Sequence, residues 1–360
     1  MRIRYWRWLA LAFLGLTWAA QSYDVLELPA VPSAKATQGM VYSVRQYYGT
    51  LYATGQRGHI LLSADAGQNW QQSDVPVRSD LLDITFVSPE LGWAVGHDGV
   101  ILHSTDGGNT WTLQFDGFRL STEGLAWYKD KAAQNPDEPF FETLVGEMEF
   151  GLEQGADKPF FRVVFLDDKH GYALGAYGIM LRTLDAGATW RPIMEQLMYD
   201  QFVHLYDVAQ LADGFIIVGE MGEMLGWSAE TSRYERLDSP YNGSLYTVLS
   251  DVGGQQLVAG LRGKVFYGSA QQGSWTEAVK PQSGSIVDSI VLEDGRVLIA
   301  ASDGKLMVSS DLTAGFTALD YQYPALLSSV VEASAGALVV AGSAGLRRVE
   351  MTAANAPREN

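Results

Sequence analysis

The fold is decided by the stretch from Leu81 to Gln114, LLDITFVSPELGWAVGHDGVILHSTDGGNTWTLQ. Apolar and polar residues alternate through four short runs, and residues typical of turns separate these runs. Alternation with a period of two indicates half-buried strands, whereas Gly, Pro, Asn and Asp indicate tight turns. The stretch therefore predicts four short strands that follow one another through hairpins.

A second stretch, FFRVVFLDDKHGYALGAYGIMLRTLDAGATWRPI from Phe160 to Ile193, repeats this pattern position by position. The central hairpin of the repeat is a Gly-x-x-Gly turn, in which a glycine supplies the positive φ that a two-residue turn needs. Five of the six intervals between successive copies of its second glycine are 41 to 44 residues, and the remaining one is 79. These seven glycines are Gly58, Gly99, Gly178, Gly222, Gly263, Gly304 and Gly345.

Seven four-stranded units in succession are typical of a β-propeller. The sequence predicts an all-β fold, a seven-bladed β-propeller with four-stranded antiparallel blades, as one domain over residues 21–351. The long interval predicts an insertion of residues 117–158 between blades 2 and 3.

The third turn of the repeat carries a more specific motif, Ser/Thr-x-Asp-x-Gly-x-x-Trp, known as an Asp-box. Its hydroxyl and carboxylate can bind backbone N–H groups of their own turn, while the tryptophan begins the outer strand and covers the apolar layer. We expect a structural role for these residues, which in three clear copies are Ser63, Asp65 and Trp70, then Ser104, Asp106 and Trp111, then Thr183, Asp185 and Trp190.

The last unit lacks an outer strand, and a propeller must protect such an edge. The segment Tyr23 to Leu28 alternates apolar and polar residues, so we expect it to supply the fourth strand of blade 7. Residues 352–360 show no pattern and are expected to be a disordered tail.

The first twenty residues combine three arginines, an apolar run from Trp8 to Trp18 and a small-residue end. This combination predicts a signal peptide over residues 1–20, and hence a periplasmic or secreted protein. The alternative is an uncleaved membrane anchor, although a bilayer needs roughly 20 apolar residues.

Composition excludes several kinds of partner and chemistry. With 42 acidic against 25 basic residues, the net charge of −17 disfavours nucleic acid, which is bound through Lys and Arg. The chain has no cysteine, which removes disulfides and thiolate metal sites, and its five histidines lack metal-binding spacing. We therefore expect no metal and no cofactor.

The stretch from Gly92 to Trp111, GWAVGHDGVILHSTDGGNTW, resembles the repeat of the photosystem II stability and assembly factor family. The resemblance implies a soluble seven-bladed propeller that helps to build or maintain a membrane protein complex. Similar proteins outside phototrophs are associated with transporters of the resistance-nodulation-division class. The resemblance thus implies a non-catalytic periplasmic scaffold or assembly factor whose partner is an integral-membrane complex or transporter.

The alternative function is a carbohydrate-active or carbohydrate-binding propeller, because sialidases and some other glycosidases also contain Asp-boxes. Sialidases with this pattern need an arginine triad and an Arg-Ile-Pro segment near the start, and the chain after residue 20 has no such segment. Paired carboxylates for glycoside hydrolysis cannot be chosen among so many acidic residues. We therefore expect no enzymatic activity.

The inter-blade connections and the Gly-x-x-Gly hairpins should lie on one face of the ring, opposite the Asp-boxes. A long acidic and aromatic excursion on that face is typical of a binding loop, and a helix is expected near Phe141 to Leu152. Whether this helix binds a partner or covers a blade is open. The candidate partner-binding residues are Trp127, Tyr128, Phe140, Phe141 and Phe150 in the insertion and Arg57, His97, Asp98, Tyr177 and Arg262 at hairpin tips.

Overall fold

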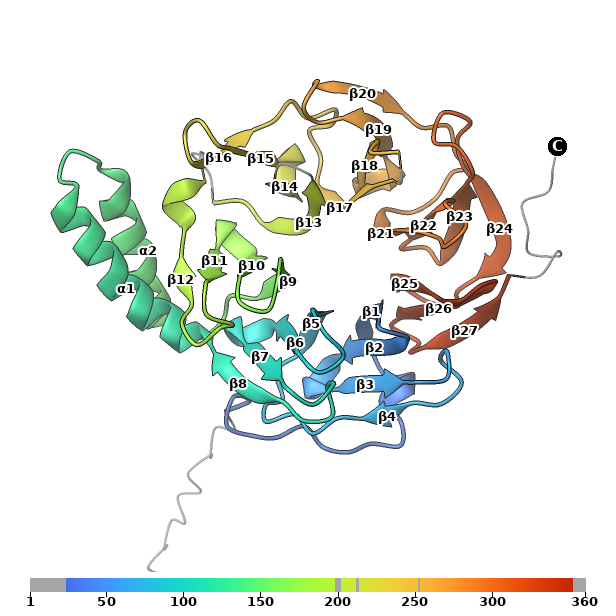
Figure 1. Cartoon of the computed structure of the whole chain (residues 1–360), viewed down its shortest axis with the longest axis horizontal. Helices are drawn as coiled ribbons and strands as arrows, with labels where there is room; N and C mark the ends of the chain where they lie inside the picture. Colours follow the sequence, from blue (N-terminus) through green and yellow to red (C-terminus); the bar gives the residue numbers. More distant parts are fainter. Residues whose placement is uncertain (1–23, 198–201, 212–213, 252, 352–360) are drawn as a thin grey trace, which may run out of the picture.

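The computed structural model describes residues 24–197, 202–211, 214–251 and 253–351. Seven antiparallel sheets stand around a central axis, as Figure 1 shows, and each follows the previous one in chain order. Within the described residues six sheets have four strands and the last has three. The seven-bladed propeller predicted from the glycine spacing is confirmed.

Each blade runs from an inner strand at the axis to an outer strand at the rim. Blade 1 comprises β1 (Val41–Tyr47), β2 (Thr50–Gly55), β3 (Ile60–Ser63) and β4 (Gln71–Gln72), and blade 2 comprises β5 (Leu81–Phe86), β6 (Gly92–Gly96), β7 (Ile101–Ser104) and β8 (Thr112–Phe115). Blade 3 comprises β9 (Phe160–Phe165), β10 (Gly171–Gly175), β11 (Met180–Thr183) and β12 (Arg191–Pro192), and blade 4 comprises β13 (Leu205–Leu211), β14 (Gly214–Gly219), β15 (Met224–Ser228) and β16 (Arg233–Arg236). Blade 5 comprises β17 (Leu245–Ser250), β18 (Gln256–Gly260), β19 (Val265–Ser269) and β20 (Ser274–Glu277), and blade 6 comprises β21 (Ile286–Val291), β22 (Val297–Ala301), β23 (Lys305–Ser309) and β24 (Thr317–Gln322). Blade 7 comprises β25 (Leu327–Ser334), β26 (Ala337–Gly342) and β27 (Arg347–Glu350).

The turn between the second and third strands of a blade lies beside the start of its inner strand. In blade 2, for example, the N–H of His97 donates to the carbonyl of Asp80, at 2.8 Å. Asp98 and Gly99 have φ values of 59° and 65°, the left-handed geometry of a two-residue hairpin. We call the side of the ring that carries these turns the hairpin face, and the opposite side the Asp-box face.

Apolar side chains fill the spaces between neighbouring blades. Between blades 2 and 3, the ring of Trp93 stacks on that of Phe165 with centroids 3.6 Å apart, and Trp190 meets Phe165 edge to face. Both tryptophans are almost completely buried. Burial of this apolar area stabilises the ring without disulfides.

The three Asp-boxes are closed by their own side chains. In the first, Ser63 donates to Asp65, the N–H of Gly67 donates to Ser63, and the N–H of Asn69 donates to Asp65, all at 2.8–2.9 Å. The boxes at Ser104 and Thr183 repeat these bonds. Trp111 and Trp190 are buried behind their turns, whereas Trp70 is half-buried.

These turns should make the fold sensitive to acid. Hydrogen bonds from the backbone and side chain of Asn69 lower the pKa of Asp65 to about 2. Partial burial opposes the same effect at Asp106 and Asp185, but hydrogen bonds outweigh it and lower both pKa values. A depressed carboxyl pKa stabilises the fold above the unfolded value near 3.9, and this contribution is lost as pH falls toward the folded value.

The triple variant Asp65→Asn, Asp106→Asn, Asp185→Asn should therefore lose less stability than the wild type between about pH 4 and about pH 2. Urea unfolding midpoints measured across this range check the prediction, with the exposed Asp168→Asn as a control. Parallel pH curves for the triple variant and the wild type would contradict it.

The predicted closure of blade 7 by Tyr23 to Leu28 is wrong. Tyr23 lies outside the described residues, and Asp24–Leu28 forms a turn in which the Asp24 carboxylate accepts the N–H of Leu26. The carbonyl of Val25 accepts the N–H of Arg78, which places this segment beside the connection between blades 1 and 2. A capped turn satisfies these backbone groups locally, so the segment adds no strand to blade 7.

Blade 7 instead meets blade 1 by side-chain packing and a few hydrogen bonds. Val331 and Val339 share an apolar cluster with Val44 and Leu51. The N–H of Leu346 also donates to the carbonyl of Thr37, at 2.9 Å. The predicted signal peptide and the predicted disordered tail lie outside the described residues.

The insertion forms two antiparallel helices, α1 (Gly117–Gln134) and α2 (Phe140–Gln154), outside the ring beside β12 (Figure 1). The second agrees with the predicted helix near Phe141–Leu152, whereas the sequence did not predict the first. Asp116 caps α1 by accepting the N–H of Arg119. No helix among the described residues has the length and hydropathy that crossing a bilayer would require.

Candidate functional site

Every inner strand begins with the same irregularity. The pairing register with the second strand skips the second residue of the inner strand, which makes a β-bulge in all seven blades. Bulges re-aim a side chain, and here the skipped residue is half-exposed at the hairpin face while its neighbours along the strand are mostly buried. The skipped residues are Tyr42, Leu82, Phe161, Tyr206, Tyr246, Val287 and Ser328.

Three of these residues join two neighbours in a continuous chain of rings across blades 3 to 5. Phe161 contacts Tyr206 at 5.6 Å, and Tyr206 contacts Tyr246 at 5.2 Å, measured between ring centroids. His204 meets the ring of Tyr177 edge to face at 4.9 Å and also contacts Phe161 and Tyr206. We call Phe161, Tyr177, His204, Tyr206 and Tyr246 the aromatic arc.

A hydrogen bond holds one end of the arc in place, and the arc remains accessible. The N–H of Tyr177 donates to Nδ1 of His204 at 3.0 Å, which ties the hairpin of blade 3 to the start of blade 4. Tyr177 is 48% exposed and the other four residues are half-buried. Burial and the nearby Glu220 carboxylate raise the pKa of Tyr206 to about 12, so its hydroxyl stays neutral. Tyrosine rings, which are apolar with one polar end, are typical of protein-binding surfaces.

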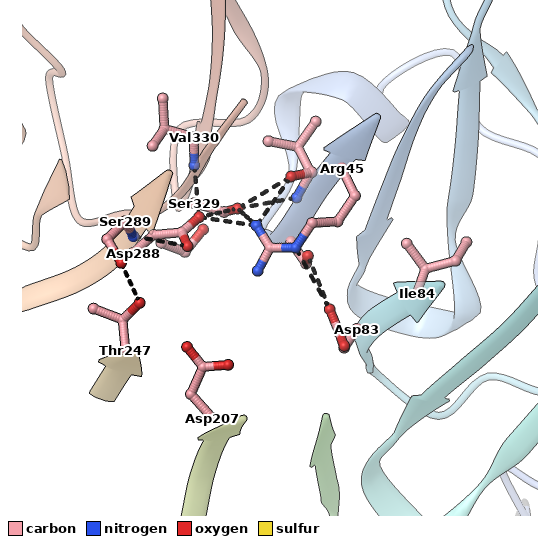
Figure 2. Close-up of polar contacts among 12 residues, drawn as sticks. Arg45, Asp83, Ile84, Asp207, Thr247, Asp288, Ser289, Ser329 and Val330 are labelled. Carbon is pink, nitrogen blue, oxygen red and sulfur yellow. Dashed lines mark hydrogen bonds and ion pairs between the residues drawn. The ribbon is translucent and has the colours of Figure 1, made fainter. Parts of the chain in front are cut away.

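The third residue of each inner strand is polar and links blades around the axis. Asp207 of blade 4 accepts the N–H of Val248 in blade 5 at 2.9 Å, and Asp288 of blade 6 accepts that of Val330 in blade 7 at 3.0 Å. Figure 2 shows Asp288 with its partners. We call this set the polar ring: Ser43, Asp83, Arg162, Asp207, Thr247, Asp288 and Ser329.

Two arginines balance the carboxylates of the polar ring. Arg162 lies 3.0 Å from Asp83 and 2.6 Å from Asp207, and Arg45 lies 3.0 Å from Asp288 (Figure 2). Burial alone would lower the pKa of Arg162, but Asp207 and Asp83 outweigh it and raise that pKa well above its usual value. Because each carboxylate is engaged by an arginine and a backbone N–H, the arrangement holds blades together and offers no unengaged acid–base pair.

The structure separates the predicted hairpin-tip residues. Arg57 in blade 1, His97 in blade 2 and Arg262 in blade 5 are exposed on different blades, and the half-buried Asp98 lies against the start of α1. Of this group, only Tyr177 belongs to the aromatic arc.

The predicted residues of the insertion mostly cover blade 3. Tyr128 and Phe141 are buried in the cluster shared with Trp190, which removes both from any surface that a partner could contact. Trp127 is half-buried, and its ring contacts the cations of Lys131 and Arg191.

The other two aromatic residues of the insertion are more accessible. Phe140 is half-buried and stacks near Phe202, with 6.5 Å between centroids. Phe150 is 52% exposed, and the Lys158 ammonium lies over its ring.

Sequence reasoning missed four residues of the aromatic arc: Phe161, His204, Tyr206 and Tyr246. A signal existed, because three of them occupy the second position of an inner strand and the fourth lies two residues before Tyr206. Simple alternation hides this signal, since a bulge changes which side a residue faces.

The family model described as photosynthesis system II assembly factor YCF48 matches residues 62–124 and 151–315. The unmatched residues between these ranges lie in α1, α2 and the connection between them. The match therefore runs from β3 in blade 1 to just past the end of β23 in blade 6 and leaves out most of the helical insertion.

Curated relatives match over shorter stretches. The chain is 28% identical to the chloroplastic photosystem II stability/assembly factor HCF136 of Arabidopsis thaliana over 137 residues, which is 37% of this chain and 25% of that protein. It is 31% identical over 75 residues to the photosystem II assembly lipoprotein Ycf48 of Synechocystis, which is 20% of this chain and 21% of that protein. The aligned stretches thus span a quarter or less of these relatives, all named as assembly factors and none as an enzyme.

Solved structures agree in fold over nearly the whole chain. A structure described as YCF48 bound to D1 peptide superposes with a TM-score of 0.63 at 16% identity, covering 90% of this chain and 99% of that one. YCF48 from Cyanidioschyzon merolae gives 0.64 at 15% identity, covering 89% and 98%. With more than half of its residues matched by the family model, this chain belongs to the photosynthesis system II assembly factor YCF48 family.

Proposed function

We propose that this chain is a non-catalytic periplasmic scaffold that holds a segment of an integral-membrane protein complex against its hairpin face. The aromatic arc carries the proposal, because it is a half-exposed cluster of rings from three blades on a rigid frame. Such clusters supply large contact areas at low cost in conformational entropy. The solved relative described as bound to D1 peptide supports a protein ligand.

The client that we propose is a transporter of the resistance-nodulation-division class or a membrane complex assembled with it. The predicted signal peptide supports a periplasmic location, where the soluble parts of such transporters are accessible. Helix α2, which lies outside the ring (Figure 1), carries the exposed Phe150, and this residue is proposed as a secondary contact.

Serine substitutions in the arc test the proposal. The variant Tyr206→Ser, Tyr246→Ser should retain at least tenfold less of its integral-membrane partner than the wild type, because central aromatic anchors each contribute roughly 2 kcal/mol or more. The measurement is affinity capture from detergent-solubilised membranes, followed by binding to the purified partner.

The matched control is Leu184→Ser, which removes an apolar side chain that is 56% exposed on the Asp-box face. Equal capture by the wild type, the control and the arc variant would refute docking at the arc. Thermal melting of all three proteins shows whether the arc variant is folded.

A further inference from the structure

A pocket of about 810 Å³ opens on the hairpin face beside blade 1. The segment after Asp24 forms one wall, and the N–H of Arg78 donates to its Val25 carbonyl while Nε of Arg78 donates to that of Pro29, both at 2.8 Å. The imidazole of His59 forms a 3.2 Å hydrogen bond with the carbonyl of Val31. These bonds hold the wall of the pocket against the blade.

The charges in this pocket are all positive. Lys35, Arg57 and Arg78 line it, and no acidic residue among the described residues does. Within the described chain, none of the three forms an ion pair, and the side chains of Lys35 and Arg57 have no hydrogen-bond partner. In a chain with a net charge of −17, this is an unusual local environment. We call it the cationic pocket.

Neighbouring titratable groups offset only part of this charge. The Asp80 carboxylate lies outside the lining and keeps its negative charge, because its hydrogen-bond donors, the N–H of Arg57 at 2.8 Å and the hydroxyl of Tyr42 at 2.7 Å, are neutral. Burial lowers the pKa of His59, so this imidazole is neutral at neutral pH and adds no charge. Three cations are therefore available to an anionic ligand.

We propose that the cationic pocket binds the carboxylates of an acidic peptide segment in the client protein. The proposal rests on the proposed function and adds the chemistry of the partner. Guanidinium groups bind carboxylates in bidentate fashion, and a ligand with at least two carboxylates complements three cations. The volume lies within the usual range of ligand sites, roughly 300–1,000 Å³.

The surrounding charge favours a peptide over an anionic lipid surface. A flat anionic membrane would face much of this acidic protein at once, and like charges repel. An extended peptide can place its carboxylates in the pocket without approaching most of that surface. The acidic surface elsewhere also disfavours acidic segments outside the pocket, which gives specificity.

Arg57 and Arg262 form a matched pair for the test. Both occupy the same position in equivalent hairpins, with φ values of 58° and 59°, but only Arg57 lines the pocket. The probe is a fluorescent peptide with three consecutive glutamates, and its counterpart has three glutamines. Binding is measured with the full-length protein at several salt concentrations.

We expect the glutamate peptide to bind at least tenfold more tightly than the glutamine peptide, and this preference to weaken with salt. Arg57→Glu should lower affinity for the glutamate peptide by at least tenfold, whereas Arg262→Glu should change it less than twofold. Equal binding of the two peptides, or equal losses in the two variants, would overturn the proposal. Tight binding to phosphatidylglycerol vesicles with no preference for the glutamate peptide would also overturn it, in favour of a lipid phosphate.

Client capture separates this proposal from the proposed function. If Arg57→Glu loses the membrane partner and Arg262→Glu retains it, the pocket contributes to client binding. If Arg57→Glu retains the partner while the arc variant loses it, the pocket proposal fails and the proposed function stands. If neither Arg57→Glu nor the arc variant loses the partner, both the pocket proposal and the proposed function are refuted.

Discussion

Replacing Arg162 by methionine should lower the free energy of unfolding by about 3–5 kcal/mol, the usual cost of removing one partner from a buried ion pair. Arg162 neutralises Asp83 and Asp207, and the side chains of both aspartates are at most 5% exposed. Methionine fills a similar volume, so the loss reports uncompensated charge more than a cavity. Urea unfolding monitored by tryptophan fluorescence gives the measurement.

Three further variants show whether charge is the cause. Arg162→Lys keeps the positive charge but loses the planar guanidinium, whose N–H groups can donate to two carboxylates. We expect it to lower the free energy of unfolding by less than Arg162→Met does. Adding Asp83→Asn and Asp207→Asn to Arg162→Met should recover part of the stability, since asparagine can still accept a backbone N–H. The exposed Arg262→Met should change stability by less than about 0.5 kcal/mol. A loss in Arg162→Met no larger than in this control would contradict the assigned role.

The blades were predictable because their determinants are local. The hairpin glycines need positive φ, and the Asp-boxes close through side chains only a few residues apart. Both requirements recur at a constant spacing in the sequence. The number of blades follows from counting them.

Helix α1 was not predictable because several of its residues favour close packing against α2 and do not favour an isolated helix. Gly124 and Ser121 are weak helix formers. A Cβ on Gly124 would lie 2.6 Å from the sulfur of Met148, and one on Gly151 would lie 2.5 Å from the hydroxyl of Ser121. These small residues let α1 and α2 approach closely, which is a tertiary requirement.

The cationic pocket was less predictable than the fold because segments that are distant in the sequence build it. Lys35, Arg57 and Arg78 are more than 20 residues apart in sequence, and only the segment after Asp24, folded against blade 1, brings them to one pocket. That segment was predicted to close blade 7 from its alternation alone. A capped turn and hydrogen bonds to Arg78 decide its position instead.

Replacing Tyr128 by alanine should destabilise the protein by about 3–5 kcal/mol, because it leaves a cavity between α1 and blade 3. Tyr128 is completely buried. Its hydroxyl donates to Glu195 at 3.0 Å and accepts the N–H of Met194 at 3.0 Å. Deleting the whole insertion would expose the same surface, so such a deletion cannot separate docking from folding. Phe150→Ser removes an exposed ring and is the better test of docking by the insertion.

Tyr128→Phe separates the hydroxyl from the ring and should cost about 1–3 kcal/mol at pH 7. Burial raises the pKa of Glu195, and the Tyr128 hydroxyl opposes this by stabilising the carboxylate. Removing the hydroxyl raises that pKa further. A raised carboxyl pKa destabilises the fold only above the unfolded value near 4.3, so the deficit of Tyr128→Phe should grow as pH rises from about 4 to 7. A deficit that does not change with pH would show that Glu195 is not coupled to Tyr128, and urea titrations of both proteins across this range decide the matter.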